Sequence, residues 1–230
     1  MLKRLVFSSV ISGVAVGLLI TVLQSLTVIP MILNAETFET LQSAPAESQG
    51  HAHNHGHGGH HHSSDEWAPE DGFERTLYTA ITNILAAIGF ALLLATCFMF
   101  RKNIDWRKGI LWGLGGFVAF QLAPSLGLPP ELPGTEAAAV EARQIWWVAT
   151  AISTAMGLLL SALAPGMLLK VSGLLLIVIP QLVGAPQPVE HAALAPESLI
   201  TQFIITTTIL GAIFWVLLGA ATAYTHSKFG

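Results

Sequence analysis

The chain has 230 residues, of which 53% are hydrophobic and only 10% are charged, and its mean hydropathy is +0.63. A typical soluble domain carries about 25% charged residues, so this composition excludes an ordinary soluble domain and indicates a chain that lies mostly in lipid. The formal net charge of −4 provides no basic excess that would recruit nucleic acid. The single cysteine, Cys97, excludes an intramolecular disulfide and a cysteine-rich metal site.

Six apolar segments predict an all-α fold, a polytopic transmembrane helical bundle. A helix needs about 20 apolar residues to cross the roughly 30 Å of hydrocarbon in a bilayer. Pro165 and Gly166 divide the fourth segment from the fifth, which is the shortest. The expected spans are residues 5–33, 77–100, 109–126, 145–163, 168–183 and 199–224.

Residues 1–33 form the first unit, for which two interpretations are open. Lys3 and Arg4 followed by an apolar run are typical of a secretory signal peptide, whose apolar core usually has about 7–15 residues. The run is longer here, which favours an uncleaved signal-anchor helix. Cleavage near Asn34-Ala35 would leave five spans instead of six.

Beyond this anchor we expect an outer loop at residues 34–76 and a five-helix membrane body at residues 77–230. The body has two further outer loops, at residues 127–144 and 184–198. With both termini in the cytoplasm, eight of the ten basic residues lie in inner segments, the exceptions being Arg75 and Arg143. Positive residues are retained inside during insertion, so we expect a multi-pass protein of the bacterial inner membrane with both termini cytoplasmic. Thirteen of the fourteen acidic residues then lie outside, and the outer face is anionic.

Related residues near the span ends also suggest three helical-hairpin repeats. Each odd span ends in a glutamine that is followed by proline and then by glutamate, as in Gln24–Glu36, Gln121–Glu131 and Gln181–Glu190. Two even spans share a seven-residue spacing, in Arg75, Thr82 and Gly89 and again in Arg143, Thr150 and Gly157. The alternative is that membrane helices draw on a restricted alphabet and produce such matches by chance. The small-xxx-small pair of Gly109 and Gly113 predicts close helix packing.

A histidine cluster in the first outer loop is the strongest chemical signal, because it holds seven of the nine histidines within twelve residues. The intervening glycine, alanine and asparagine residues provide no apolar core. Imidazole is a ligand for zinc, copper, nickel, cobalt and iron, so the cluster predicts binding of a divalent metal. It acts as a capture antenna, as an essential site, or as a solvated loop that binds metal incidentally. The predicted ligands are His51, His53, His55, His57, His60, His61 and His62.

Further polar residues form a candidate path for the captured cation. No charged residue lies deep within an expected span, so the candidates inside the membrane are Gln121 and Gln181. The alternatives are a solvated acidic face for the carboxylates and interhelical hydrogen bonding for the glutamines. His191, in the last outer loop, is a further candidate metal ligand. The acidic members of the path are Asp65, Glu66, Asp71, Glu74, Glu131 and Glu190.

No sequence motif supports an enzyme or a prosthetic group. The chain lacks a GxxxxGK[ST] phosphate loop, an HExxH zinc helix and a GxSxG nucleophile elbow. The expected partners are therefore membrane lipid and a divalent metal ion.

Several strings of the chain are typical of one family. They are MLKRLVFSSVISGVAVGLL, the histidine-rich loop, EWAPEDGFERTLYT, PPELPGTEAAAVEARQIWWVAT and GAPQPVEHAALAPESL, which together cover nearly the whole length. In these strings the chain resembles the CbtA family, predicted cobalt transporter subunits. The resemblance implies that cobalt is the metal, in connection with cobalamin supply. It also implies a small single-span partner that bears histidines, CbtB, and about five spans.

The histidines by themselves suit nickel or zinc as well as cobalt. Together, the residues and the resemblance predict an integral membrane subunit of a divalent-metal uptake transporter. The alternatives are a membrane-bound metal receptor or sensor, and a structural scaffold subunit that does not transport.

Overall fold

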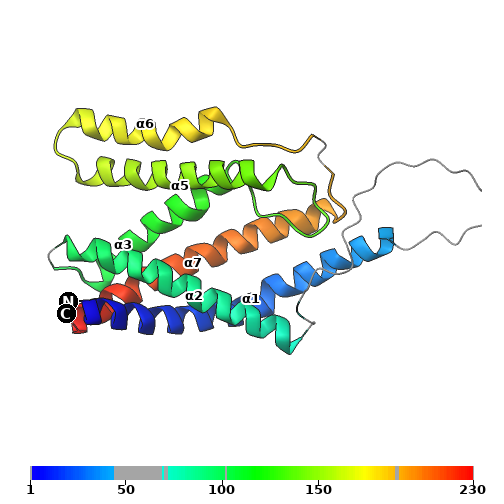
Figure 1. Ribbon diagram of the computed structural model, residues 1–230, viewed down its shortest axis with the longest axis horizontal. Coiled ribbons are helices and arrows are strands. Elements are labelled where there is room, and N and C mark those ends of the chain that lie inside the picture. The colour runs from blue at the N-terminus through cyan, green and yellow to red at the C-terminus, as the bar shows by residue number, and fades with distance from the viewer. Residues whose placement is uncertain (1, 44–68, 70–71, 102, 190–191, 230) are drawn as a thin grey trace, which may run out of the picture.

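In the computed structural model, residues 2–43, 69, 72–101, 103–189 and 192–229 are described. All the regular elements in these ranges are helices, which confirms the all-α prediction. The elements are α1 (Leu2–Ser43), α2 (Phe73–Met99), α3 (Trp106–Phe117), the π-helical η1 (Val118–Leu122), α4 (Ala123–Ser125), α5 (Val140–Leu163), α6 (Met167–Val183) and α7 (Glu197–Phe229) (Figure 1).

Each expected span overlaps a helix or, for the third, an unbroken run of helices. α1, α2, α5 and α7 are long and apolar enough to cross a membrane, whereas α6 is a shorter apolar helix. α3, η1 and α4 follow one another without a gap and together cover the third expected span. α1 is longer than expected and continues past Leu33 to Ser43. The six-span count and the threefold repeat stay predictions.

The two ends of the described chain lie at the same end of the molecule (Figure 1). There the ring centroids of Phe7 and Phe229 are 5.4 Å apart, and the hydroxyl oxygens of Ser12 and Thr225 are 2.9 Å apart. The α2–α3 and α5–α6 turns lie at this end as well, and we call it the terminal end.

The opposite end carries two long connections, which follow α4 and α6 (Figure 1). An isolated antiparallel bridge between Thr135 and Ala193 joins them. The backbone N–H of Glu136 donates to the carbonyl of Ala192 at 2.9 Å, and that of Leu194 donates to the carbonyl of Gly134 at 3.2 Å. The two connections therefore form one cap, and we call this the capped end.

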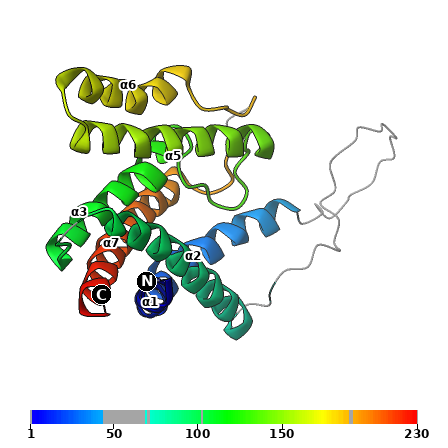
Figure 2. The ribbon, with the colours of Figure 1, turned by 60° about the vertical axis from the view of Figure 1, so that its left-hand side comes forward.

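Close packing joins α1 to α2 and α7, and α3 to α7, while α5 and α6 form a hairpin on one side of the molecule (Figures 1 and 2). Glycines allow the contact of α3 with α7. A Cβ atom on Gly113 would overlap the carbonyl oxygen of Trp215, and one on Gly109 would overlap that of Gly219. The packing role predicted for this glycine pair is confirmed, because the two backbones touch where side chains are missing.

We expect Gly113→Ala to destabilise the protein, because the added methyl group meets backbone atoms that cannot yield unless α3 and α7 separate. Overpacking of this kind costs about 1–3 kcal/mol, and the loss is measured as a lower midpoint of thermal unfolding in detergent. Gly115→Ala on the same helix is the matched control, because no described atom outside its own helix lies within 4 Å of that Cβ position. Equal midpoints for the two variants would contradict the proposed backbone contact.

Candidate functional site

Much of the predicted metal-binding set lies outside the described residues. This holds for His51, His53, His55, His57, His60, His61, His62, Asp65, Glu66, Asp71, Glu190 and His191. Four members of the predicted path are described: Glu74, Gln121, Glu131 and Gln181. Within the described ranges, no three His, Cys, Asp or Glu side chains gather to hold a metal ion.

Gln121 lies in η1, the π-helical turn that interrupts the α3–α4 helix. The cause is Pro124, which has no N–H to donate and whose ring would collide with the carbonyl four residues earlier in a regular α-helix. The turn widens instead, and the backbone N–H of Ala123 donates to the carbonyl of Val118, five residues back. Single π-helical turns are frequent at functional sites.

The side chain of Gln121 lies against the backbone of α7. Its Nε2 donates to the carbonyl oxygen of Thr207 at 3.1 Å. Gly211, one turn further along α7, leaves the necessary space, because a Cβ atom there would overlap the Gln121 amide. Gln181 of α6 reaches α4 instead, since its Nε2 donates to the carbonyl of Ala123 at 2.9 Å. Both glutamines thus make the interhelical hydrogen bonds that were the alternative to a ligand role.

A cavity of about 560 Å³ lies at the capped end, between η1–α4, the connection after α4, and α5. Its polar lining includes two of the predicted path residues, Gln121 and Glu131, together with Arg143 and Gln144. A smaller cavity of about 220 Å³, between the two connections and α7, shares the Glu131 and Arg143 walls. The structure therefore brings Glu131 and Gln121 to one surface.

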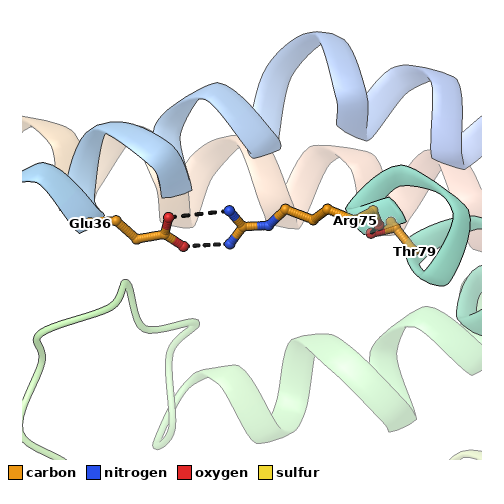
Figure 3. A network of polar contacts seen from close by, with 3 residues as sticks. All are labelled: Glu36, Arg75 and Thr79. Atoms are coloured by element: carbon orange, nitrogen blue, oxygen red, sulfur yellow. Dashed lines mark hydrogen bonds and ion pairs between the residues drawn. The ribbon is translucent and has the colours of Figure 1, made fainter. Parts of the chain in front are cut away.

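Two arginine–glutamate ion pairs lie near the capped end. Arg143 of α5 donates from Nη2 to Oε2 of Glu131 at 2.7 Å. Arg75 of α2 forms a two-pronged pair with Glu36 of α1, in which Nη1 donates to Oε2 and Nη2 donates to Oε1 (Figure 3). Sequence reasoning placed the two arginines as exceptions to the charge asymmetry and as members of the proposed repeat, without naming their partners. The signal that could have revealed their partners was present, because the proposed repeat aligns Arg75 with Arg143 and Glu36 with Glu131.

Glu74 lies in the first turn of α2, at the capped end. A carboxylate is favourable near the positive end of a helix, so a local role in starting α2 accounts for this position. It does not line the cavities that hold Glu131.

Long apolar helices indicate a polytopic helical membrane protein, and a cavity with a few polar side chains lies at one end of it. Residues 2–227 match the CbtA family, described as "Probable cobalt transporter subunit", and the chain belongs to this family. Among curated proteins and among solved structures, none matches the sequence. The family assignment confirms the resemblance seen in the sequence and identifies a membrane transport subunit.

We expect Gly211→Ala to push the Gln121 amide away from α7 and to remove its hydrogen bond to Thr207. The cost should be about 0.5–1.5 kcal/mol in the free energy of unfolding. In a Gln121→Ala background the same change should cost much less, because the displaced amide is absent. A double-mutant cycle should therefore show coupling between positions 121 and 211.

Gly89→Ala is the control for this cycle, since no described atom outside its own helix lies within 4 Å of the Cβ position. Its effect should add to that of Gln121→Ala. Simple additivity for Gly211→Ala as well would contradict the contact between the amide and α7.

Proposed function

We propose that this protein takes up divalent cobalt through the bacterial inner membrane as one subunit of a transporter. The observation that carries the proposal is membership of the CbtA family across residues 2–227. The cavity of about 560 Å³ supports it, because this cavity holds an acidic and an amide member of the predicted path, Glu131 and Gln121.

In the proposed orientation, the terminal end faces the cytoplasm and the capped end faces outward. Two facts support this orientation. The terminal end carries the chain ends and the basic turns, with Arg101, Arg107 and Lys170. The ion-paired glutamates Glu36 and Glu131 lie toward the capped end. Basic residues favour the cytoplasmic side of a membrane protein.

The proposed route begins with capture of the ion by the histidines of residues 51–62. Asp65, Glu66, Asp71 and Glu74 then pass the ion toward an entrance at Glu131, Glu190 and His191. Gln121 and Gln181 follow inside the membrane. Each glutamine donates from Nε2, and no described residue donates to either Oε1, so both carbonyl oxygens remain available as ligands. We also propose that a small single-span partner with histidines completes the pathway.

Uptake of radioactive cobalt tests the function. Proteoliposomes that contain this chain and its partner subunit should accumulate cobalt in a saturable manner. Liposomes with the partner alone, or with this chain inserted after heat denaturation, are the controls. Cobalt binding to the reconstituted complex without accumulation would contradict transport and would indicate a metal receptor instead.

Deletion of residues 51–62 tests the antenna. We expect uptake to fall at low cobalt and to recover at high cobalt, because an antenna raises the local ion concentration without forming the crossing site. Failure of high cobalt to restore uptake would identify an essential site instead.

The antenna should also depend on pH. Only neutral imidazole coordinates a metal, so capture should be strong at about pH 7.5 and weak at about pH 5.5, on either side of the ordinary histidine pKa of about 6.5. Equilibrium dialysis of cobalt against the full protein and the deletion variant measures this difference. Equal binding by the full protein at both pH values would contradict capture by histidine.

A further inference from the structure

The two arginine–glutamate pairs are built differently. In the Arg75–Glu36 pair, both Nη atoms and both carboxylate oxygens are used (Figure 3). In the Arg143–Glu131 pair, only Nη2 and Oε2 meet. Within the described ranges, Oε1 of Glu131 and the Nη1 and Nε atoms of Arg143 have no hydrogen-bond partner. The second pair therefore keeps an unused acceptor beside unused donors.

This open pair lines the cavity of about 560 Å³ and also the smaller cavity beside it. Its side chains are 29% exposed for Arg143 and 27% exposed for Glu131, so both are partly accessible. The amide side chains of Gln121 and Gln144 line the larger cavity too, as do the rings of Phe120 and Trp147, whose centroids are 6.4 Å apart. Sites for small organic molecules commonly have about 300–1,000 Å³ and a few polar groups among apolar ones.

The charges of this cavity do not suit a bare divalent cation. Glu131 and Arg143 are the charged residues of its lining, so their charges cancel. A bare cation would gain one carboxylate and would be repelled by the guanidinium next to it. Arginine is well shaped to bind a carboxylate through two parallel hydrogen bonds. The free carboxylate oxygen of Glu131 can accept a hydrogen bond from an N–H group.

We propose that this cavity binds an α-amino carboxylate, and that cobalt reaches it as a complex with such a ligand. The carboxylate accepts from Arg143, and the amino group donates to Oε1 of Glu131. The same two groups are presented by the free zwitterion and by a metal chelate, in which the coordinated amine keeps its N–H bonds. The ligand site stands on the geometry of the cavity, whereas the identity of the metal rests on the proposed function.

The test uses the full chain in nanodiscs of phosphatidylglycerol, a lipid whose headgroup has no amino group. Equilibrium dialysis measures binding of radiolabelled L-histidine alone, of cobalt alone, and of L-histidine with cobalt. L-Histidine should bind with and without cobalt. The double variant E131Q/R143Q should weaken its binding by about tenfold or more, because two charged contacts are lost. The matched control, E36Q/R75Q, removes the closed pair and should change binding by less than about twofold.

A second variant keeps the test decisive if E131Q/R143Q does not fold. Val148 lines the same cavity from α5 and is exposed, so Val148→Trp fills the space without removing a charge. It should weaken L-histidine binding as well. In the wild-type protein, L-histidine should change the tryptophan fluorescence, and Trp147→Phe should reduce that change.

Three results would overturn the proposal. If L-histidine binding is unchanged in both E131Q/R143Q and Val148→Trp, the ligand binds outside this cavity. Binding of cobalt alone, with the same dependence on the Glu131–Arg143 pair and without any binding of L-histidine, makes this a bare-cation site. Loss of L-histidine binding in phosphatidylethanolamine nanodiscs assigns the cavity to a lipid headgroup.

Failure of this inference can be distinguished from failure of the proposed transport function. Cobalt uptake that proceeds equally with and without amino acids would overturn the inference and leave the transporter in place. Amino-acid binding by a protein that moves no cobalt would overturn the transport function and leave the ligand site in place.

Discussion

The contact of the α3 and α7 backbones fixes the helix from which one wall of the cavity is built. In lipid, helices gain little from hiding apolar surface against one another, so close packing and hydrogen bonds decide which helices associate. Gly109 and Gly113 let α3 lie directly on α7, and the same helix continues through η1 and α4. The α5–α6 hairpin joins the rest largely through this helix. α5 packs on α3, η1 and α4, and Gln181 of α6 donates to Ala123. The η1–α4 wall of the cavity therefore belongs to a helix that is fixed by its contact with α7.

The ion pairs at the capped end contribute little to the stability of the fold. Their side chains are about one quarter to one third exposed, and exposed pairs contribute only about 0–1 kcal/mol. Their main effect is to hold particular segments and charges in place. The Arg75–Glu36 pair ties the start of α2 to the end of α1, so it holds together the two ends of the segment that carries the histidine cluster. The Arg143–Glu131 pair instead brings opposite charges to the rim of a cavity.

The helices could be predicted from the sequence because long apolar runs and their proline or glycine boundaries are local properties. The all-α fold, the positions of the helices and the family resemblance are all confirmed. Glu131 and Gln121 were proposed as path residues, and they do line one cavity. The route itself is untested, since the histidine cluster lies outside the described residues.

Partner choice among the helices could not be read from the sequence. The threefold repeat suggested the hairpins α1–α2, α3–α5 and α6–α7. Of these, α1 and α2 are packed together, but the main partner of α3 is α7, and α6 packs on α5. That choice depends on which glycines face each other, which six similarly apolar helices do not reveal. The contact of the Gln121 side chain with α7 could not be predicted from the sequence for another reason. It follows from the π-helical turn that Pro124 imposes, and from the space left by Gly211 on a distant helix.

The charge distribution along the helices bears on the form in which a metal could cross. Charged side chains occur near the helix ends, as with Glu36 in α1 and Lys228 in α7, while the middle of each long helix has none. A bare divalent ion would therefore meet amide and hydroxyl oxygens in a medium where an uncompensated charge is costly. A ligand that brings its own carboxylate carries the compensating charge with it. Two such ligands neutralise a divalent ion, and for the neutral complex the amides of Gln121 and Gln181 are adequate contacts, whereas for the bare ion they would be too few.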